Sequence, residues 1–405
     1  MSEHRLLIVE EALKNYLGHW YEYNRSIIAA NKAAGVEVTV LSHCQVDKKV
    51  SENLGAIPTF KYTSWDGIYS SPSALRRYWG ILKHNWRVFK TLDKYFTRSQ
   101  PYDCVFVPTV IIYHLIGWWF IAKKYSRKKI HRLVLFIRNN AASYAEGSST
   151  PIFKRSTFFL KTILQAYRGW IDSGVVCFAT DCDRLAKEYK ILCGIDFLLI
   201  PSQQMPCETK EHVFKKAGDF ITMSCLGPAR YEKGGDLLCA AVIQFRERYP
   251  QANVKFIIQW NDELTAPDGS QFERAEILKN DPNVLFLNRA LSSEDYLKYF
   301  METDCMILPY RRQSYHSRLS GIAIEAFIAG IPVIFTRDTW IEDAVSKFGV
   351  GLGIENENIQ DLVEKIKIMA AQIDDFKKEA LKKAPSAQAA HSPEKFMECL
   401  WGRRL

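Results

Sequence analysis

The chain has 405 residues, 47% of them hydrophobic and 24% charged, and a formal net charge of +9. This composition excludes a disordered or low-complexity protein, and the length favours two domains of ordinary size. Ten cysteines are scattered singly, without a C-x-x-C pair or a Cys/His cluster at zinc spacing. We therefore expect reduced thiols, no bound metal and a cytoplasmic location.

The first half of the chain alternates between strand-like and helix-like segments. Residues 6–9 predict a strand, residues 20–34 a helix and residues 36–41 a second strand, which is the opening of a doubly wound sheet. The N-terminus is thus itself strand-like and has no signal peptide pattern. Residues 43–70 read as irregular. Further strands are expected at residues 102–107, 132–137, 174–179 and 198–201, and helices at residues 71–96, 111–122, 153–168 and from residue 180 onward.

Two features of this half needed a choice between interpretations. The apolar run from Cys104 to Ala122 is interrupted by Pro108 and His114, so we interpret it as a strand, a loop and a helix rather than a membrane span. Residues 141–150 are small and polar, which predicts a loop.

The second half repeats the alternation after a polar linker at residues 202–210. Strands are expected at residues 220–226, 254–259, 283–287, 305–309, 332–335 and 349–354. Helices are expected at residues 235–249, 274–279, 295–300, 339–348 and 358–375, with an apolar helix ending near Trp401. The chain is therefore predicted to be an α/β protein with two doubly wound, Rossmann-like domains.

The stretch from Cys305 to Thr336 combines a buried strand, a basic loop, a helix and a second strand. Ser320-Gly321 begins the helix, and a helix N-terminus offers free backbone N–H groups to a phosphate. Glu325 is the one charge inside this apolar helix. Because Glu is rarely buried without a partner, we expect it to hold hydroxyl groups of a ligand.

Two segments resemble a known family. EAFIAGIPVI resembles the E-A-x-A-x-G-x-P-V-I segment of the group 1 glycosyltransferases, nucleotide-sugar enzymes with the two-domain GT-B fold. Upstream, LGPARYEKGGDLL resembles the family signature G-R-x-x-x-x-K-G-x-D-x-L, with Pro228 directly after the glycine and Arg230 two places later. The resemblance implies an acceptor-binding domain, residues 1–203, facing a nucleotide-sugar-binding domain, residues 204–385, across a cleft. It also implies that residues 386–405 pack back on the first domain.

The resemblance implies a donor site in the second domain. Arg230 and Lys233 would clamp the diphosphate beside Gly227, and Glu325 would bind the ribose. Further contacts to the donor are implied for the nucleobase region Asn288 to Leu291, for the side chains of Tyr310, Arg311 and Arg318, and for the backbone of Ser320, Gly321 and Ile322. The first glutamate of the family's E-x7-E motif is replaced by Ser317, which leaves the sugar open.

The acceptor side is placed in the first domain. Gly18 and His19 follow the first strand, where they would face the cleft. The resemblance places such a glycine-bearing loop against the donor phosphates or the acceptor, so Gly18 is a candidate donor contact, and a packing role for His19 is equally open. Arg138, Asn139 and Glu146 are acceptor candidates. A retaining enzyme like this family needs no side-chain nucleophile and no metal, whereas an inverting one needs a base, for which His19 and Glu146 are the groups to test.

Charge is distributed unevenly along the chain. Residues 1–210 contain 29 Lys and Arg against 17 Asp and Glu, a balance of +12, whereas residues 211–405 carry −3. The cations lie beside aromatic stretches, which suits an anionic membrane surface as well as an ordinary solvated face, and no motif indicates nucleic acid.

We therefore expect a glycosyltransferase that moves a sugar from a UDP-, GDP- or dTDP-sugar to a glycan or lipid-linked acceptor in polysaccharide biosynthesis. It would need no cofactor and could be peripheral on the inner face of the membrane. A sugar-nucleotide epimerase and a catalytically silent relative that binds glycan or membrane are the alternatives.

Overall fold

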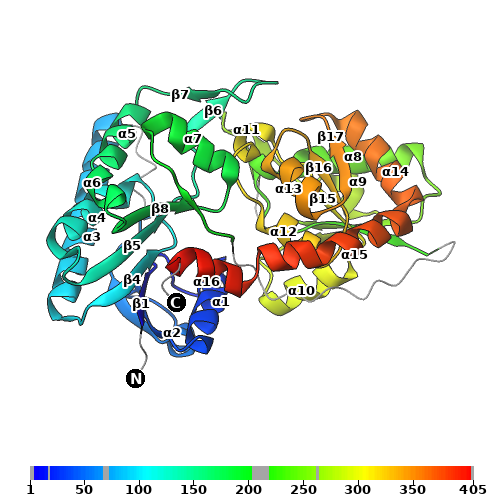
Figure 1. The fold of residues 1–405 in the computed structure, drawn as a ribbon. Coiled ribbons are helices and arrows are strands. Elements are labelled where there is room, and N and C mark those ends of the chain that lie inside the picture. Colours follow the sequence, from blue (N-terminus) through cyan, green and yellow to red (C-terminus); the bar gives the residue numbers. More distant parts are fainter. Residues whose placement is uncertain (1–3, 17–18, 67–72, 203–218, 261–263, 403–405) are drawn as a thin grey trace. The chain divides into compact units, whose positions relative to one another are not determined.

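The structure is a computed structural model that describes residues 4–16, 19–66, 73–202, 219–260 and 264–402. It divides into two compact units, coloured from blue to red along the chain in Figure 1. Unit 1 comprises residues 1–205 together with residues 392–405, and unit 2 comprises residues 206–391.

Unit 1 contains a seven-stranded parallel sheet in the order β3-β2-β1-β4-β5-β8-β9. The strands are β1 (Arg5–Val9), β2 (Glu37–His43), β3 (Ala56–Phe60), β4 (Tyr102–Val107), β5 (Ile130–Phe136), β8 (Val176–Thr180) and β9 (Leu198–Leu199). The order reverses direction between β1 and β4, so their carboxyl ends open a crevice suited to a ligand.

Helices cover both faces of this sheet. They are α1 (His19–Ala33), α2 (Lys48–Leu54), α3 (Ala74–Arg98), α4 (Ile112–Tyr125), α5 (Thr157–Gln165), α6 (Arg168–Asp172), α7 (Asp183–Cys193) and α16 (Pro393–Trp401). In Figure 1, α3 and α4 lie on one side of the sheet and α1 and α16 on the other. The indole of Trp401 is buried and donates a hydrogen bond of 2.8 Å to Asn31 of α1, so the last helix completes the core of unit 1.

Residues 43–70 are more regular than predicted, because they contain α2 and β3. Helix α2 is short and ends at Gly55, which has a positive φ of 64°, and β3 is an edge strand that contains Pro58. Short elements at a sheet edge lack the apolar periodicity that identifies longer ones. The predicted loop at residues 141–150 likewise contains part of a hairpin, β6 (Ala142–Tyr144) and β7 (Pro151–Phe153).

Unit 2 contains a six-stranded parallel sheet in the order β14-β11-β10-β15-β16-β17. The strands are β10 (Ile221–Cys225), β11 (Val254–Gln259), β14 (Val284–Leu287), β15 (Cys305–Leu308), β16 (Val333–Thr336) and β17 (Gly351–Ile354). Counted along the chain, this is the order 3-2-1-4-5-6 of a dinucleotide-binding sheet, with its switch point between β10 and β15. A small hairpin, β12 (Leu264–Thr265) and β13 (Gln271–Phe272), lies outside this sheet.

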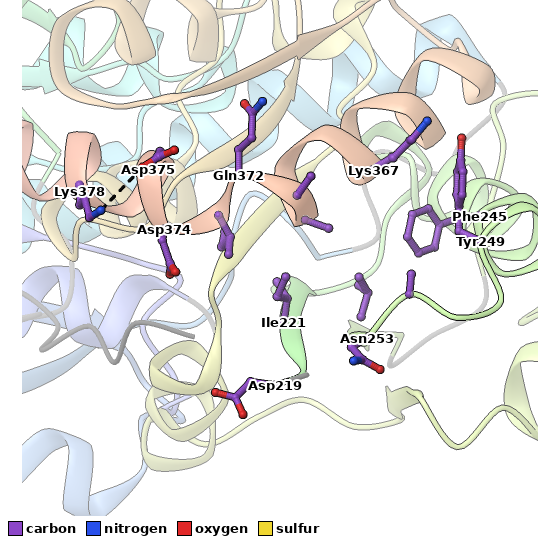
Figure 2. Close-up of a pocket in the computed structure, with 15 residues that line it drawn as sticks. Asp219, Ile221, Phe245, Tyr249, Asn253, Lys367, Gln372, Asp374, Asp375 and Lys378 are labelled. Carbon is purple, nitrogen blue, oxygen red and sulfur yellow. Dashed lines mark ion pairs between the residues drawn. The ribbon is translucent and has the colours of Figure 1, made fainter. Parts of the chain in front are cut away.

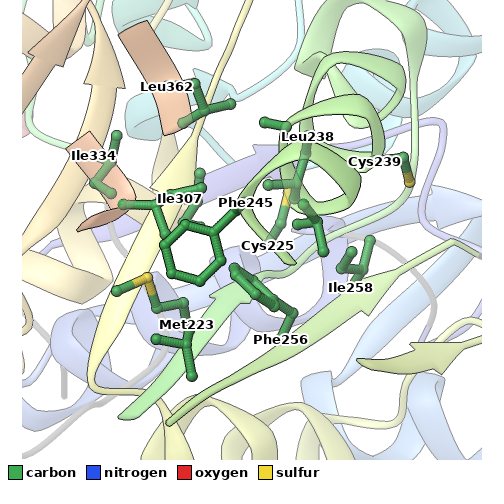
Figure 3. Packing of buried hydrophobic residues seen from close by; sticks show 14 of the residues in the cluster. Met223, Cys225, Leu238, Cys239, Phe245, Phe256, Ile258, Ile307, Ile334 and Leu362 are labelled. Carbon is green, nitrogen blue, oxygen red and sulfur yellow. The ribbon is translucent and has the colours of Figure 1, made fainter. Parts of the chain in front are cut away.

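The helices of unit 2 are α8 (Gly235–Arg248), α9 (Glu276–Lys279), α10 (Ser293–Glu302), α11 (Arg312–Tyr315), α12 (Gly321–Ile328), α13 (Trp340–Phe348), α14 (Ile359–Ala371) and α15 (Ile373–Ala390), with a 3₁₀ turn at Tyr231–Lys233. Helices α8 and α14 supply Phe245 and Leu362 to one core, where they meet Phe256 of β11 and Ile307 of β15 (Figure 3). None of the described helices is both long and apolar enough to cross a membrane.

A buried ion pair ties α15 to the sheet. Lys377 Nζ lies 2.6 Å from Asp304 Oδ1, and both side chains are almost fully buried. The second carboxylate oxygen of Asp304 accepts a hydrogen bond of 2.8 Å from the backbone N–H of Thr222 in β10. The pair therefore fixes the amino-terminal end of β15 between a strand and a helix.

Candidate active site

Two loops meet at the switch point of unit 2. One follows β10 and runs through Gly227 to Lys233, and the other follows β15 and runs from Pro309 to Ser320. Their backbones touch at Gly234, where an added β-carbon would lie 2.1 Å from the carbonyl oxygen of Pro309. Only glycine fits there, because its φ is also positive, at 68°.

Gly227 brings the first loop against the start of α12. It has a φ of 90°, and an added β-carbon would lie 2.5 Å from Ile322 Cδ1 and 2.7 Å from Lys233 Nζ. Its N–H donates a hydrogen bond of 2.7 Å to Oε1 of Gln259, at the end of β11. The absence of a side chain at Gly227 therefore leaves the space in which the lysine ammonium group lies.

The side chain of Lys233 is half-buried against Gly227. Partial desolvation, together with the neighbouring cations Arg230 and Arg318, lowers its pKa to about 8, against the opposing influence of Cys225 and Glu232. Among the described residues, none forms a hydrogen bond or ion pair with this ammonium group. A partly desolvated cation without a counterion is unfavourable, so the arrangement is suited to an anionic ligand.

Arg230 and Arg318 approach from the two loops and share one carboxylate. Arg230 Nη1 lies 3.9 Å and Arg318 Nη1 3.7 Å from Oε1 of Glu232. Both guanidinium groups remain partly exposed, with side-chain exposures of 51% and 38%. These two arginines share one carboxylate, and Lys233 lies nearby without a counterion among the described residues, so the cluster carries an excess of positive charge that suits a diphosphate.

Helix α12 begins beside the cation cluster of Arg230, Lys233 and Arg318. The hydroxyl of Ser320 caps the helix by accepting a hydrogen bond of 3.3 Å from the backbone N–H of Ala323. Ile322, which contacts the space at Gly227, and Glu325 are three residues apart and so lie on the same face of α12. Glu325 is buried and accepts a hydrogen bond from the hydroxyl of Tyr296 in α10.

In the second loop, Tyr310 lies near Lys233, whereas Arg311 pairs with residues of the protein itself. The ring of Tyr310 is buried, 4.3 Å from the ring of Tyr315 and 5.9 Å from Lys233 Nζ. Arg311, expected to contact sugar or phosphate, is instead held by two hydrogen bonds of 3.0 and 2.6 Å to Asp236. It also pairs with Glu357 at 2.6 Å and covers the ring of Tyr231. Arg311 therefore clamps the two loops together, and its guanidinium is fully used within the protein.

Ser317, at the place of the family's first glutamate, is buried. Its neighbour His316 is buried too and approaches Asp338, with Nδ1 at 3.0 Å from the Asp338 carbonyl oxygen.

The nucleobase candidates follow β14. Asn288 is exposed and accepts a hydrogen bond from the guanidinium of Arg274, and Leu291 is half-buried. Gln259 connects this segment to the phosphate loop, because its Nε2 donates to the carbonyl oxygen of Arg289 at 3.4 Å while its Oε1 accepts from Gly227. Gln259, Glu232 and Tyr296 are thus site residues that sequence reasoning missed.

In unit 1, the described candidates from the sequence do not all lie in one place. Gly18 lies outside the described residues, and His19 begins α1 with a side chain that is not described. Arg138 pairs with Asp181 at 3.3 Å and covers the ring of Tyr23. Glu146 is exposed at the turn between β6 and β7, away from the residues that line the pocket of this unit.

That pocket has a volume of about 630 Å³ and contains Asn139, the remaining candidate. It lies beyond the carboxyl ends of β4 and β5, between α3, the start of α4 and α5. Ligands in doubly wound sheets bind at this edge.

A second feature at the switch point of unit 1 is the buried carboxylate of Glu11. It accepts hydrogen bonds from the backbone N–H of Ser64, from His84 Nε2 at 3.0 Å and from His114 Nε2 at 2.9 Å. Burial raises the pKa of Glu11, but the two histidines outweigh it and hold this pKa well below its usual range. Glu10 beside it accepts from the Thr109 hydroxyl at 2.7 Å, and burial raises its pKa to about 7.

Glu11, His84 and His114 have the residue types of a metal site, and their ligand atoms lie within 4.8 Å of one another. However, Nδ1 of His114 accepts the backbone N–H of Ile111 at 3.3 Å, so the ring proton is on Nε2. A metal-bound histidine instead donates from its other nitrogen. The cluster therefore fits a hydrogen-bonded carboxylate rather than a metal centre.

Unit 2 has a further pocket of about 690 Å³ at the opposite edge of its sheet (Figure 2). Ile221 at the start of β10 and Val254 at the start of β11 line it, together with Asp374 and Lys378 of α15. Because it lies at the amino ends of the strands, it is separate from the cation cluster at their carboxyl ends.

Comparison with known proteins relates the second half of the chain to a described family. Residues 221–372 match the family described as Glycosyl transferases group 1. A D-inositol 3-phosphate glycosyltransferase from Corynebacterium urealyticum is 26% identical over 134 residues, which are 32% of this chain and 30% of that relative. The match thus spans less than a third of the relative's length.

Solved structures resemble the chain over nearly its whole length. Sucrose-phosphate synthase from Thermosynechococcus elongatus has a TM-score of 0.64 at 14% identity and covers 97% of this chain and 96% of its own. HepE from Anabaena, solved in complex with UDP and glucose, has a TM-score of 0.58 at 12% identity and covers 97% of both chains. The α/β architecture with two Rossmann-like units is therefore that of GT-B glycosyltransferases. In its fold, and in the sequence of residues 221–372, the chain is similar to the group 1 glycosyltransferases.

Proposed function

We propose that the protein transfers a glycosyl group from a nucleotide diphosphate-sugar, bound by unit 2, to an acceptor bound by unit 1. The observation that carries this proposal is the half-buried Lys233 ammonium group, which has no counterion among the described residues and lies beside Arg230, Arg318 and the start of α12. Fixed cations and a helix N-terminus stabilise the negative charge that grows on a departing diphosphate.

In the proposed reaction, an acceptor hydroxyl oxygen forms a bond to the anomeric carbon of the sugar. The bond from that carbon to the phosphate oxygen breaks, and the nucleoside diphosphate leaves with the electron pair. The acceptor proton is released to the leaving phosphate or to solvent. We favour retention of the anomeric configuration by resemblance to the family, and the configuration of the product measured by NMR would test this.

Glu325 is proposed to accept hydrogen bonds from the ribose hydroxyls of the donor. Its contact with Tyr296 and its place on the same face of α12 as Ile322 support this role. Glu325→Ala should then weaken the binding of UDP but leave inorganic pyrophosphate, which has no ribose, unaffected. Equal losses for both ligands would contradict the assignment.

The test of the function is nucleotide release from a panel of UDP-, GDP- and dTDP-sugars. Release of nucleotide that depends on an added acceptor supports a transferase. Release of an altered free sugar without acceptor would instead identify an epimerase. A protein that binds no nucleoside diphosphate at all would overturn the proposal in favour of a silent relative.

Peripheral attachment to an anionic membrane is also proposed for unit 1. Leu75, Trp79, Leu82 and Trp86 of α3 are exposed, with Trp79 at 66%, and recur at the spacing of one helix face. Among the exposed cations of the same helix, Arg76, Lys83, Lys90 and Lys94 recur along the adjacent face. An apolar stripe beside a basic one is the pattern of a helix that lies in a membrane interface.

Vesicle flotation tests this attachment. A larger fraction of the protein should float with vesicles that contain phosphatidylserine than with vesicles of pure phosphatidylcholine. The double variant Trp79→Ser, Trp86→Ser should float less than the unchanged protein with either kind of vesicle. Both indoles are largely exposed, so the substitutions should leave folding intact. Failure of the protein to float with either composition would reject membrane attachment.

A further inference from the structure

The pocket of unit 1 has an amphipathic lining. Most of its wall is apolar or aromatic, from Ile81 of α3, Val110 and Ile111 before α4, and Phe159 and Leu160 of α5. Its volume of about 630 Å³ is in the range of pockets for small organic ligands. An apolar wall of this kind favours a ligand with a hydrocarbon portion.

The charged groups of the lining have one sign. Arg77 of α3 and Lys154 before α5 are both exposed cations on the pocket wall, and the described lining residues include no carboxylate. Asn139, Asn140, Ser156 and Thr157 add neutral polar groups. The charge of the lining is therefore complementary to an anion.

The pocket is continuous with the exposed aromatic surface. Tyr78 lines the pocket and belongs to the first turns of α3, between the exposed Leu75 and Trp79. Its ring lies 6.4 Å from that of Phe159, edge to face, which joins α3 to α5 at the rim. Phe158, next to Phe159, is 72% exposed. An apolar path thus leads from the exposed stripe of α3 into the pocket.

We propose that the pocket receives a lipid-linked phosphate from a membrane, with the hydrocarbon chain along the apolar wall and the phosphate beside Arg77 and Lys154. This inference rests on the proposed function, because it names the chemical class of the acceptor that unit 1 binds. Charge complementarity selects the phosphate, and continuity with the exposed stripe of α3 selects a lipid over a water-soluble sugar phosphate.

The test measures the binding of three probes by calorimetry, without donor present. Dodecyl phosphate below its micelle concentration contains both chemical features, dodecyl glucoside only the chain, and inorganic phosphate only the anion. We expect dodecyl phosphate to bind at least tenfold more tightly than either of the other probes. Equal binding of dodecyl phosphate and dodecyl glucoside would overturn the role of the cations, and equal binding of dodecyl phosphate and inorganic phosphate would overturn that of the apolar wall.

Variants locate the site. Arg77→Gln and Lys154→Gln should each weaken dodecyl phosphate binding about tenfold, as expected for loss of one charge-assisted contact of about 1.4 kcal/mol. Lys48→Gln, an exposed lysine on α2 away from the pocket, is the matched control and should have no effect. Unchanged binding in both pocket variants would reject the site.

Nucleotide binding separates this inference from the proposed function. UDP affinity should be the same in all three variants, because their substitutions lie in unit 1. A protein that binds dodecyl phosphate as expected but no nucleotide would retain the lipid site and lose the transferase, and the reverse result would lose only the lipid site.

Discussion

The ammonium nitrogen of Lys233 lies 2.7 Å from the position that a β-carbon on Gly227 would occupy. The two residues are therefore mutually dependent, since only a glycine leaves room for the lysine ammonium group, and this group is the half-buried cation of the site. The motif G-x-x-x-x-x-K in this chain thus has a steric explanation as well as an electrostatic one.

Gly227→Ala should abolish this arrangement. The new methyl group collides with Lys233 Nζ and Ile322 Cδ1 and forces an alanine into a φ of 90°. We expect UDP affinity to fall at least tenfold and the unfolding free energy to fall by about 1–2 kcal/mol from the backbone strain. Gly269→Ala is the matched control, because Gly269 has the same φ of 90° with no atom within 4 Å of its added β-carbon. The Gly269→Ala variant should be less stable but should bind UDP as tightly as the unchanged protein. A loss of UDP affinity in this control would contradict the steric explanation.

Removing either Lys233 or Arg230 should weaken the binding of the nucleotide-sugar donor. Lys233→Ala or Arg230→Ala is expected to cost about 2–5 kcal/mol of diphosphate binding, as for truncating one side of a charge pair. The larger loss is expected for Lys233, because Arg230 is half exposed and partly screened. Isothermal calorimetry with UDP measures the effect, and unchanged affinity and turnover in both variants would reject the clamp.

The pH dependence of donor binding follows from the lowered pKa of Lys233. In the free protein the ammonium group loses its proton near pH 8, well below the ordinary lysine value. The diphosphate stays ionised above its last pKa of about 6, so UDP affinity should fall as the pH rises above about 8, by up to tenfold per pH unit. Lys233→Arg should remove this fall, because arginine remains protonated. A fall of the same size in the arginine variant would show that another group titrates.

The same group predicts a change in stability. Lysine has an ordinary pKa of 10.5 and Lys233 one of about 8, so between these values the unfolded chain binds more protons than the folded one. In the absence of ligand, stability should therefore rise with pH from about 8 to about 10.5 relative to Lys233→Met, which cannot titrate. Chemical denaturation of the two proteins across this window measures the difference, and parallel curves would contradict the burial of the ammonium group.

The ion pair between Lys377 and Asp304 should dominate the stability of unit 2. Lys377→Met leaves the Asp304 carboxylate buried without its cation and should cost about 3–5 kcal/mol of unfolding free energy. Adding Asp304→Asn should recover part of this loss, because the remaining buried charge is then removed. Thermal denaturation of the single and double variants tests the coupling, and additive losses would show that the pair does not interact.

The sequence predicted the backbone around the candidate donor site where local patterns determine it. The strand, loop and helix from Cys305 to Ile328 follow from one apolar run, a Ser-Gly helix start and a second apolar run. Gly227 and Gly234 have positive φ where the two loops of the site come together. These are properties of contiguous residues, so one sequence is enough to identify them.

Contacts between distant segments could not be predicted in this way. Arg311 and Arg318 look alike in the sequence, yet Arg311 is clamped by Asp236 and Glu357, which lie far away along the chain. Gln259 enters the site only because β11 lies between β10 and β14 in the sheet. The order of the strands in the sheet decides which polar groups meet, and this order cannot be predicted from the local sequence.

In unit 1 the failure has the same origin. His84 and His114 belong to two helices that each read as apolar or aromatic, and their common partner Glu11 follows β1. The candidates Arg138 and Glu146 were chosen from their loop alone, whereas the pocket depends on α3, α4 and α5 together.

Helix α16 has a consequence for how the chain reaches its folded state. Phe396, Leu400 and Trp401 are almost fully buried in unit 1, although all of unit 2 precedes them along the chain. During synthesis, the hydrophobic core of unit 1 therefore stays partly exposed to solvent until α16 has been translated and can pack against it. A C-terminal truncation should for this reason damage the amino-terminal half of the protein first, and limited proteolysis of a chain shortened before Ser392 would reveal it.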